Sequence, residues 1–325
     1  MPISIHRWLL SGVLALCSFG AIAQPQPSWP QKAIRIIVPF APGGTSDTVS
    51  RRLAMELTRQ LGQTVYVENR AGAMGTIGMS EAAKSRPDGY TLVANDTGVT
   101  MLPHIQKKLP YDLDKDFVPI GAGVFSPFGL IVNADSRFQS LQDLVKQGRA
   151  KPDSLSYGSG GIGTSPHLAA ESFAQAAGLK LTHVPFKGAG EAIIAVASKV
   201  IDMQLVTPST AMANIKGGKL KMLAISGDQR LSDLPDVPTF AEAGLPDYEV
   251  WNWIGLWAPA GTPAAIVERL RAEVGQALKS PGMQAFARDI SAQPKVVVGP
   301  TFAQLVKDTD HKWKALIDTL DLSDQ

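Results

Sequence analysis

The feature that most constrains this fold is a short module that occurs twice: an apolar strand, a glycine-rich turn and a helix opening with Thr or Ser. The first copy is AIRIIVPFAPGGTSD (residues 33–47), and the second is LSYGSGGIGTSPH (residues 155–167). Such a turn directs free backbone N–H groups and the positive end of a helix dipole at one point, where an anion can bind. One copy in each half of the chain predicts a cleft that holds an acidic ligand from both sides.

The N-terminus has the three parts of a secretory signal. A basic start (MPISIHR) precedes a short apolar run that ends in AIA at residues 21–23. This pattern predicts a signal peptide over residues 1–23, cleaved after Ala23, and hence export. Two alternatives are a buried N-terminal helix and lipid modification at Cys17; Leu16 disfavours the second, because that cleavage prefers a small residue before the cysteine.

The remaining composition excludes several classes of function. Cleavage leaves about 300 residues, which suits two domains of about 150 residues each. The one cysteine, Cys17, leaves with the signal, so disulfides, thiol catalysis and cysteine metal sites are excluded from the mature chain. The 31 basic and 29 acidic residues nearly balance, and they form no dense basic run. We therefore expect no nucleic-acid partner.

Strands and helices alternate along most of the chain, which predicts an α/β fold with a mostly parallel sheet, flanked by helices, in each of two lobes. Residues 251–257 are expected to return as a strand to the first lobe, and a last helix over residues 301–320 is expected to brace both lobes. The predicted domains are a signal peptide (1–23), lobe 1 (24–125 plus 250–300) and lobe 2 (126–249 plus 301–325). The other expected strands are 33–38, 64–68, 90–94, 128–132, 155–157, 181–185, 201–206 and 220–225.

Seven segments occur in an order that is specific to one family. They are IRIIVPFAPGGTSD, VENRAGAMGTIG, PDGYTL, YGSGGIGTSPHLAAE, HVPFKGAGEA, LPDVPTFAEAGLP and WAPAGTP. With them, the chain resembles the periplasmic receptors of tripartite tricarboxylate transporters, the Bug-type solute-binding proteins. The resemblance implies a two-lobed "Venus flytrap" with the ligand cleft between the lobes. It also implies a periplasmic monomer that captures a small carboxylate (a di- or tricarboxylate or an aromatic carboxylate) and delivers it to membrane permease subunits, without a cofactor or a metal.

The resemblance also implies which residues bind the ligand. They come from a first-lobe loop, from the turns at two second-lobe helix starts, and from the ends of two strands. The candidates are Phe40, Ala41, Pro42, Gly43, Gly44, Thr45, Asp47, Asp96, Ser159, Thr164, Ser165, His167, Gly188, Ala189, Gly190 and Thr207. Three of them have a structural alternative: an N-terminal acid of the helix for Asp47, a helix cap for Ser165, and a purely structural histidine for His167.

Two positions depart from the family pattern. Thr207 follows a strand after which the family commonly has a Phe-Asp-Asn run, so an acid that could face a ligand ammonium is missing there and an amino-acid ligand is disfavoured. Asp96 stands where many relatives have Thr and Asn; we expect a turn-forming residue, with an acceptor for a hydroxyl or ammonium group as the alternative. Four aromatic residues are expected in the core rather than in a pocket: Phe125, Phe128, Trp251 and Trp253.

Three other functions were weighed against the carboxylate carrier. The segment GSGGIG (residues 158–163) matches a dinucleotide fingerprint, but the next strand, HVPFK, lacks the acid that holds the ribose. A serine hydrolase is disfavoured because Tyr157 stands where G-x-S-x-G needs a glycine before Ser159. We therefore expect no catalytic residue. A receptor that signals to a membrane sensor kinase stays open beside delivery to a permease.

Overall fold

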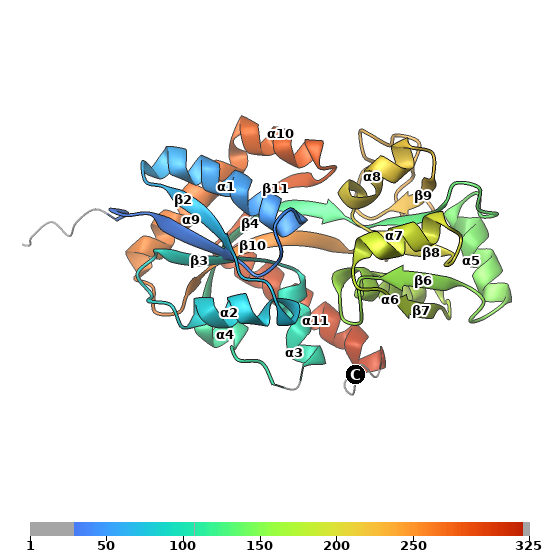
Figure 1. Cartoon of the computed structure of the whole chain (residues 1–325), viewed down its shortest axis with the longest axis horizontal. Helices are drawn as coiled ribbons and strands as arrows, with labels where there is room; N and C mark the ends of the chain where they lie inside the picture. Colours follow the sequence, from blue (N-terminus) through green and yellow to red (C-terminus); the bar gives the residue numbers. More distant parts are fainter. Residues whose placement is uncertain (1–28, 107, 321–325) are drawn as a thin grey trace, which may run out of the picture.

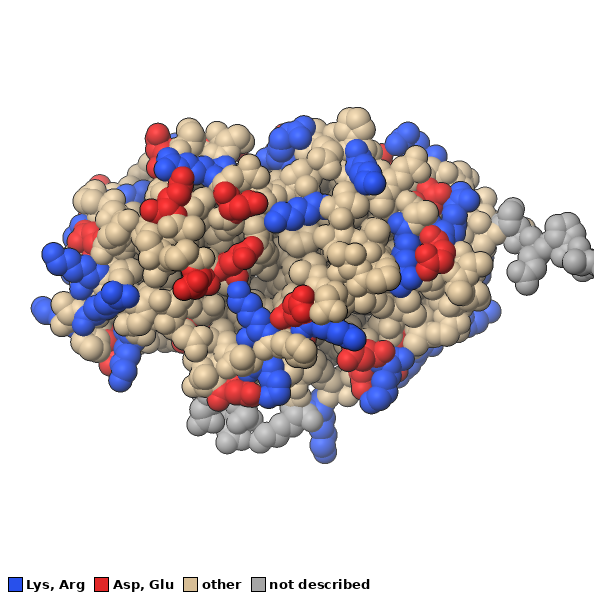
Figure 2. Space-filling model, turned by 180° about the vertical axis from the view of Figure 1, so that it is seen from behind, with Lys and Arg blue, Asp and Glu red and all other residues tan. Residues whose placement is uncertain are grey.

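The computed structural model describes residues 29–106 and 108–320, which form two lobes lying side by side (Figure 1). The predicted signal peptide, its cleavage after Ala23, and Cys17 lie outside these residues. Within the described part, no helix is both long and apolar enough to cross a membrane. On the face shown in Figure 2, basic and acidic side chains are interspersed along the surface.

The first lobe contains a six-stranded sheet in the order β11-β4-β10-β3-β1-β2. Helices α1, α9 and α10 contribute to the core on one face, and α2 packs on the other. The strands are β1 (Ile34–Val38), β2 (Val65–Asn69), β3 (Thr91–Asp96), β4 (Phe117–Pro127), β10 (Trp251–Pro259) and β11 (Gln293–Val298). The helices are α1 (Thr45–Leu61), the 3-10 turn η1 (Ala73–Gly75), α2 (Thr76–Ala83), α3 (Gly98–Ile105), α4 (Leu113–Asp116), α9 (Ala264–Lys279) and α10 (Pro281–Asp289).

The second lobe contains a five-stranded sheet in the order β7-β6-β8-β5-β9. Helices α5 and α6 share one core with the sheet, and α7 and α8 share another. The strands are β5 (Gly129–Asn133), β6 (Ser156–Ser159), β7 (Thr182–Pro185), β8 (Met203–Val206) and β9 (Leu220–Ile225). The helices are α5 (Leu141–Ala150), α6 (Ser165–Ala177), α7 (Ala189–Ala197) and α8 (Pro208–Lys216).

Both sheets are mixed, and most strands in each run in one direction, in line with the expectation of mostly parallel sheets. Strands β1, β2 and β3 are parallel, as are β6, β7 and β8, but β10 runs antiparallel to β3 and β4, and β5 runs antiparallel to β8 and β9. The reason is the path of the chain. Strands β5 and β10 each enter their sheet from the other lobe and so run against their neighbours, while β11 returns from α10 of the same lobe and also pairs antiparallel with β4.

Three segments connect the lobes. Strand β4 continues into β5, and β10 returns to the first sheet, as the sequence predicted for residues 251–257. The third segment is helix α11 (Pro300–Leu320), whose Phe302 and Val306 lie in a first-lobe core while Trp313 and Leu316 lie in a second-lobe core. This helix therefore packs on both lobes; the exact domain boundaries remain a prediction.

Ser226 joins the two chain segments that cross between the lobes, β4–β5 and the start of β10. Its hydroxyl accepts a hydrogen bond from the N–H of Phe128 at 2.8 Å and donates one to the carbonyl of Val250 at 2.5 Å. Its own N–H donates to the carbonyl of Phe128 at 2.8 Å. Because Ser226 is buried, no water can replace its hydroxyl, and loss of the group leaves two backbone partners unsatisfied.

We expect Ser226→Ala to lower the free energy of unfolding by about 1–3 kcal/mol, since it orphans a buried N–H and a buried carbonyl. Urea denaturation followed by circular dichroism measures the change. Ser232→Ala is the matched control, because Ser232 is exposed on the same lobe, and we expect a change within about 0.5 kcal/mol. Equal stability of the two variants would contradict the structural role of Ser226.

Candidate functional site

A cavity of about 480 Å³ lies between the two lobes, with residues from both sheets and both crossing strands in its wall. Its size falls in the range of small-molecule sites, about 300–1,000 Å³. It is lined by Phe40, Gly44, Thr45, Ser46, Met74, Asn95, Asp96, Gly98, Leu102, Phe128, Gly163, Thr164, Ser165, Pro166, Ala189, Val206, Thr207, Thr210 and Asn252. Their positions show that the cavity lies where β1, β3, β6 and β8 end.

Four helices begin at this cavity without a side-chain cap. They are α1 from the first lobe and α6, α7 and α8 from the second, and at each of them the N-cap side chain makes no capping hydrogen bond. Among the helices that begin elsewhere, the side chains of Asp112, Ser140 and Ser280 cap α4, α5 and α10, whereas α2 and α9 have no side-chain cap. Uncapped first-turn N–H groups still need acceptors, and an anion supplies them.

Among the residues that the structure describes, Asp96, at the end of β3, is the one charged residue that lines the cavity. Its Oδ1 accepts a hydrogen bond from the N–H of Gly98 at 2.9 Å, which closes a turn at the start of α3, as the sequence predicted. Burial raises the pKa of Asp96 to about 6, although the Gly98 N–H opposes this shift. Asp96 is thus both a turn residue and a wall of the cavity.

The first-lobe loop places three of its seven candidates, Phe40, Gly44 and Thr45, in the cavity wall. Ala41, Pro42, Gly43 and Asp47 do not line it.

Asp47 instead holds the loop together. Its carboxylate accepts hydrogen bonds from the N–H of Gly43 at 2.9 Å, from Nδ2 of Asn69 at 2.8 Å and from Nε of Arg51 at 3.0 Å. Burial acts to raise the pKa of Asp47, but these hydrogen bonds outweigh it and keep the pKa below the usual value. These contacts fit the structural alternative for Asp47, an acid at the N-terminus of the helix.

The second lobe places Thr164, Ser165, Ala189 and Thr207 in the wall. Ser165 is inside α6 and Thr164 occupies the N-cap position, so the alternative that Ser165 caps the helix is wrong. The helix begins one residue earlier because Thr164 already has the extended backbone of a cap (φ −76°, ψ 157°). The remaining second-lobe candidates do not line the cavity: Ser159, His167, Gly188 and Gly190.

Ser159 and His167 lie behind the glycine turn and support it. Ser159 Oγ lies 2.7 Å from Nε2 of His183 and accepts a hydrogen bond from the N–H of Gly161 at 3.1 Å. His167 Nδ1 accepts from the N–H of Gly163 at 3.2 Å, and its ring lies 4.2 Å from that of His183. Burial lowers the pKa of His167 to about 3, with a contribution from His183, and burial lowers the pKa of His183 to about 4.

Sequence reasoning missed several residues of the wall. Five of them lie next to predicted positions in the sequence, so they would be included if each motif were extended by one or two residues: Ser46, Asn95, Gly98, Gly163 and Pro166. Phe128 was expected in the core, and no sequence motif indicated Asn252. Both residues reach the cavity only because the chain crosses between the lobes at these positions. Asn252 Oδ1 accepts a hydrogen bond from the Thr97 hydroxyl at 2.9 Å. The other missed residues are Met74, Leu102, Val206 and Thr210.

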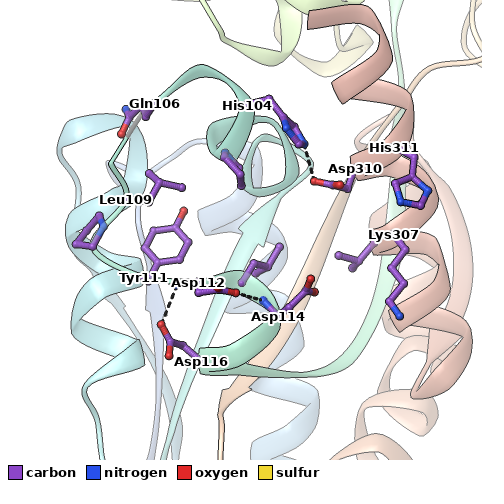
Figure 3. A pocket seen from close by; sticks show the side chains of 14 residues that line it. His104, Gln106, Leu109, Tyr111, Asp112, Asp114, Asp116, Lys307, Asp310 and His311 are labelled. Carbon is purple, nitrogen blue, oxygen red and sulfur yellow. Dashed lines mark hydrogen bonds and ion pairs between the residues drawn. The ribbon is translucent and has the colours of Figure 1, made fainter. Parts of the chain in front are cut away.

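A larger cavity, of about 930 Å³, lies between the segment before β4 and helix α11 (Figure 3). Its described wall carries four aspartates, Asp112, Asp114, Asp116 and Asp310, against one lysine, Lys307, and His104 lies 2.8 Å from Asp310. The helix start in this wall, that of α4, is already capped by Asp112. The acidic wall disfavours an anionic ligand, so the smaller cavity between the lobes is the better candidate for a carboxylate site.

The two buried histidines generate a pH prediction. Their pKa values in the folded protein lie below the 6.5 of an unfolded chain, so the unfolded state binds more protons between about pH 6.5 and 4. The free energy of unfolding should therefore fall as the pH is lowered through this window, by on the order of 1 kcal/mol per pH unit for each histidine.

Urea denaturation at a series of pH values measures the fall. We expect the double variant His167→Gln/His183→Gln, checked for folding at pH 7.5, to show a shallower fall than the wild type. His311→Gln, at an exposed position of α11, is the control and should leave the profile unchanged. Imidazole NMR signals of His167 and His183 that titrate near pH 6.5 in the folded protein would contradict the prediction.

Comparisons with known proteins agree with this architecture. The protein BugT of Bordetella pertussis (strain Tohama I) is 32% identical over 95% of this chain and 96% of its own length. The structure of MatC from Rhodopseudomonas palustris with bound malate is 31% identical, covers 89% of this chain and 99% of its own, and superposes with a TM-score of 0.74. R. palustris Rpa4515 with adipate is 30% identical, covers 90% and 98% of the two chains, and has a TM-score of 0.78.

A family model describes the same relationship at the level of sequence. The model of the tripartite tricarboxylate transporter family receptor matches residues 49–322, which is most of the chain. The match includes the second glycine turn, the three lobe connections and most of the cavity wall. The two-lobed fold and the family model together show that this chain belongs to the tripartite tricarboxylate transporter receptor family.

Proposed function

We propose that this protein is a periplasmic solute-binding protein that captures a small carboxylate between its lobes and delivers it to a tripartite tricarboxylate-type permease. The observation that carries the proposal is the set of four uncapped helix starts at one cavity. The relatives solved with malate and adipate support a dicarboxylate as the ligand class. The signal-peptide pattern supports export, with cleavage after Ala23.

In this proposal the carboxylate oxygens accept hydrogen bonds from backbone N–H groups at Gly44–Thr45 on one lobe and at the start of α6 on the other. Because the ligand contacts both lobes at once, it binds the closed arrangement more tightly than the open one. Binding therefore shifts the population toward the closed form, by hinge motion at the crossing segments. The permease then distinguishes loaded from empty receptor by shape. The proposal contains no catalytic step and no cofactor.

We expect a small dicarboxylate to raise the melting temperature of the protein, since a ligand that binds only the native state stabilises it. The mature chain is unfolded and refolded first, to remove any ligand carried through purification, and is then screened with malate, adipate, citrate, benzoate, sugars and NAD. A rise with a carboxylate supports the proposal. A rise with sugars or NAD alone would overturn it.

Gly44→Val is expected to weaken carboxylate binding at least tenfold, because the new side chain occupies the cavity over the start of α1. A Cβ at Gly44 meets nothing closer than 3.9 Å, and the backbone there (φ −75°) accepts valine, so the fold should persist. Ser232→Val is the control, because Ser232 is exposed on the second lobe and does not line the cavity. Isothermal titration calorimetry measures both affinities; equal affinity of the Gly44 variant and wild type would exclude this contact.

A further inference from the structure

The cavity combines anion-binding helix starts with a carboxylate of its own. Within residues 29–106 and 108–320, Asp96 is the one charged lining residue, and no lysine or arginine of these ranges accompanies it in the wall. Among the ion pairs of the described residues, none includes Asp96. A purely anionic ligand would therefore bring its own charge next to a carboxylate that no cationic side chain of the described residues pairs with.

The geometry leaves Asp96 open toward the ligand. Of its two carboxylate oxygens, Oδ1 accepts the Gly98 N–H, and the hydrogen bonds of the described residues leave Oδ2 without a protein partner. A Cβ at Gly98 would come within 2.9 Å of Asp96 Oδ1 and 3.9 Å of Ser165 Oγ, so the glycine keeps a space open between the carboxylate and the opposite lobe.

The start of α3 already has an acceptor, unlike the four other helix starts in the wall. The carboxylate of Asp96, two residues before Gly98, accepts a hydrogen bond from the Gly98 N–H. The protein itself therefore compensates the positive end of this helix dipole. The ligand carboxylate is then directed to the starts of α1 and α6, where no side chain caps the helix. This arrangement separates an anion-binding part of the cavity from a part that carries one negative charge.

We propose that the physiological ligand carries a positively charged nitrogen in addition to its carboxylate, and that this nitrogen pairs with Asp96. The inference rests on the proposed carboxylate function and adds the ligand's second charged group. A cationic nitrogen compensates the desolvated Asp96 carboxylate when the lobes close, which a hydroxyl does only in part. The acid that the sequence lacks after β8, at Thr207, is supplied here from the other lobe.

The test uses ligand pairs that differ in one group, an ammonium against a hydroxyl or hydrogen. The pairs are aspartate and malate, glutamate and 2-hydroxyglutarate, 2-aminoadipate and adipate, and 4-(aminomethyl)benzoate and 4-methylbenzoate. Calorimetry at pH 7.5 on the refolded mature protein compares the members of each pair. We expect the ammonium member of the best-fitting pair to bind at least tenfold more tightly than its partner.

The variant Asp96→Asn identifies the group responsible. Asparagine keeps an Oδ1 acceptor for the Gly98 N–H, so the turn and the fold should persist, as circular dichroism can verify. We expect the variant to lose the preference for the ammonium member while it binds the anionic member as well as, or better than, the wild type. Asp135→Asn, at a side chain 84% exposed on the second lobe, is the matched control and should keep the wild-type preference.

Several outcomes would overturn the inference. Equal affinity within each pair, tighter binding of the anionic member, or an ammonium preference that persists in Asp96→Asn would each do so. Tight binding of the anionic member with uptake of one proton, measured by titration in buffers of different ionisation enthalpy, would show that a proton compensates Asp96 instead. Failure of every member of every pair to bind would contradict the carboxylate function itself, and the inference with it.

Discussion

Backbone N–H groups at helix starts require hydrogen-bond acceptors. Four such helix starts converge on one cavity in this structure, and the candidate site depends on that convergence. Helices α1, α6, α7 and α8 begin at the C-terminal ends of strands in two facing sheets, and none has a side-chain cap. An anion can satisfy them, although the described part of the wall contains no lysine or arginine. A site of this kind is selective because its donors are fixed by the backbone, and its strength depends on both lobes being present.

The lobe connections are where the proposed closure would act. Strand β4 passes into β5, β10 returns, and α11 packs on both lobes, so a motion of one lobe against the other would bend these segments. Ser226 ties the two crossing strands together through Phe128 and Val250. Phe128 also lines the cavity, which places one residue of the hinge in direct contact with the ligand space. Ligand contact and hinge geometry are therefore adjacent in space, which suits a receptor that reports occupancy by closure.

Sequence patterns predicted the elements that carry regular apolar periodicity, and they failed where packing overrides local preference. Strand β4 was missed because its Gly121 and Gly123 suggest a loop. In the structure a Cβ at Gly123 would lie 2.1 Å from Leu278, so the glycines let α9 pack closely on the sheet. The start of α6 was displaced by one residue because both Thr164 and Ser165 are good caps, and only the backbone angles distinguish them.

The sequence by itself determined the repeated strand-turn-helix modules, the family, and eight of the residues in the cavity wall, because each of these depends on short segments with strong local signals. Only the tertiary structure decided which candidates face the cavity. It turned Asp47 inward to Gly43, Asn69 and Arg51, and it placed Ser159 and His167 behind the glycine turn. It also placed Asp96 in the wall of the cavity between the lobes. Local sequence specifies a turn, whereas the direction of each side chain depends on the packing of segments far apart in the chain.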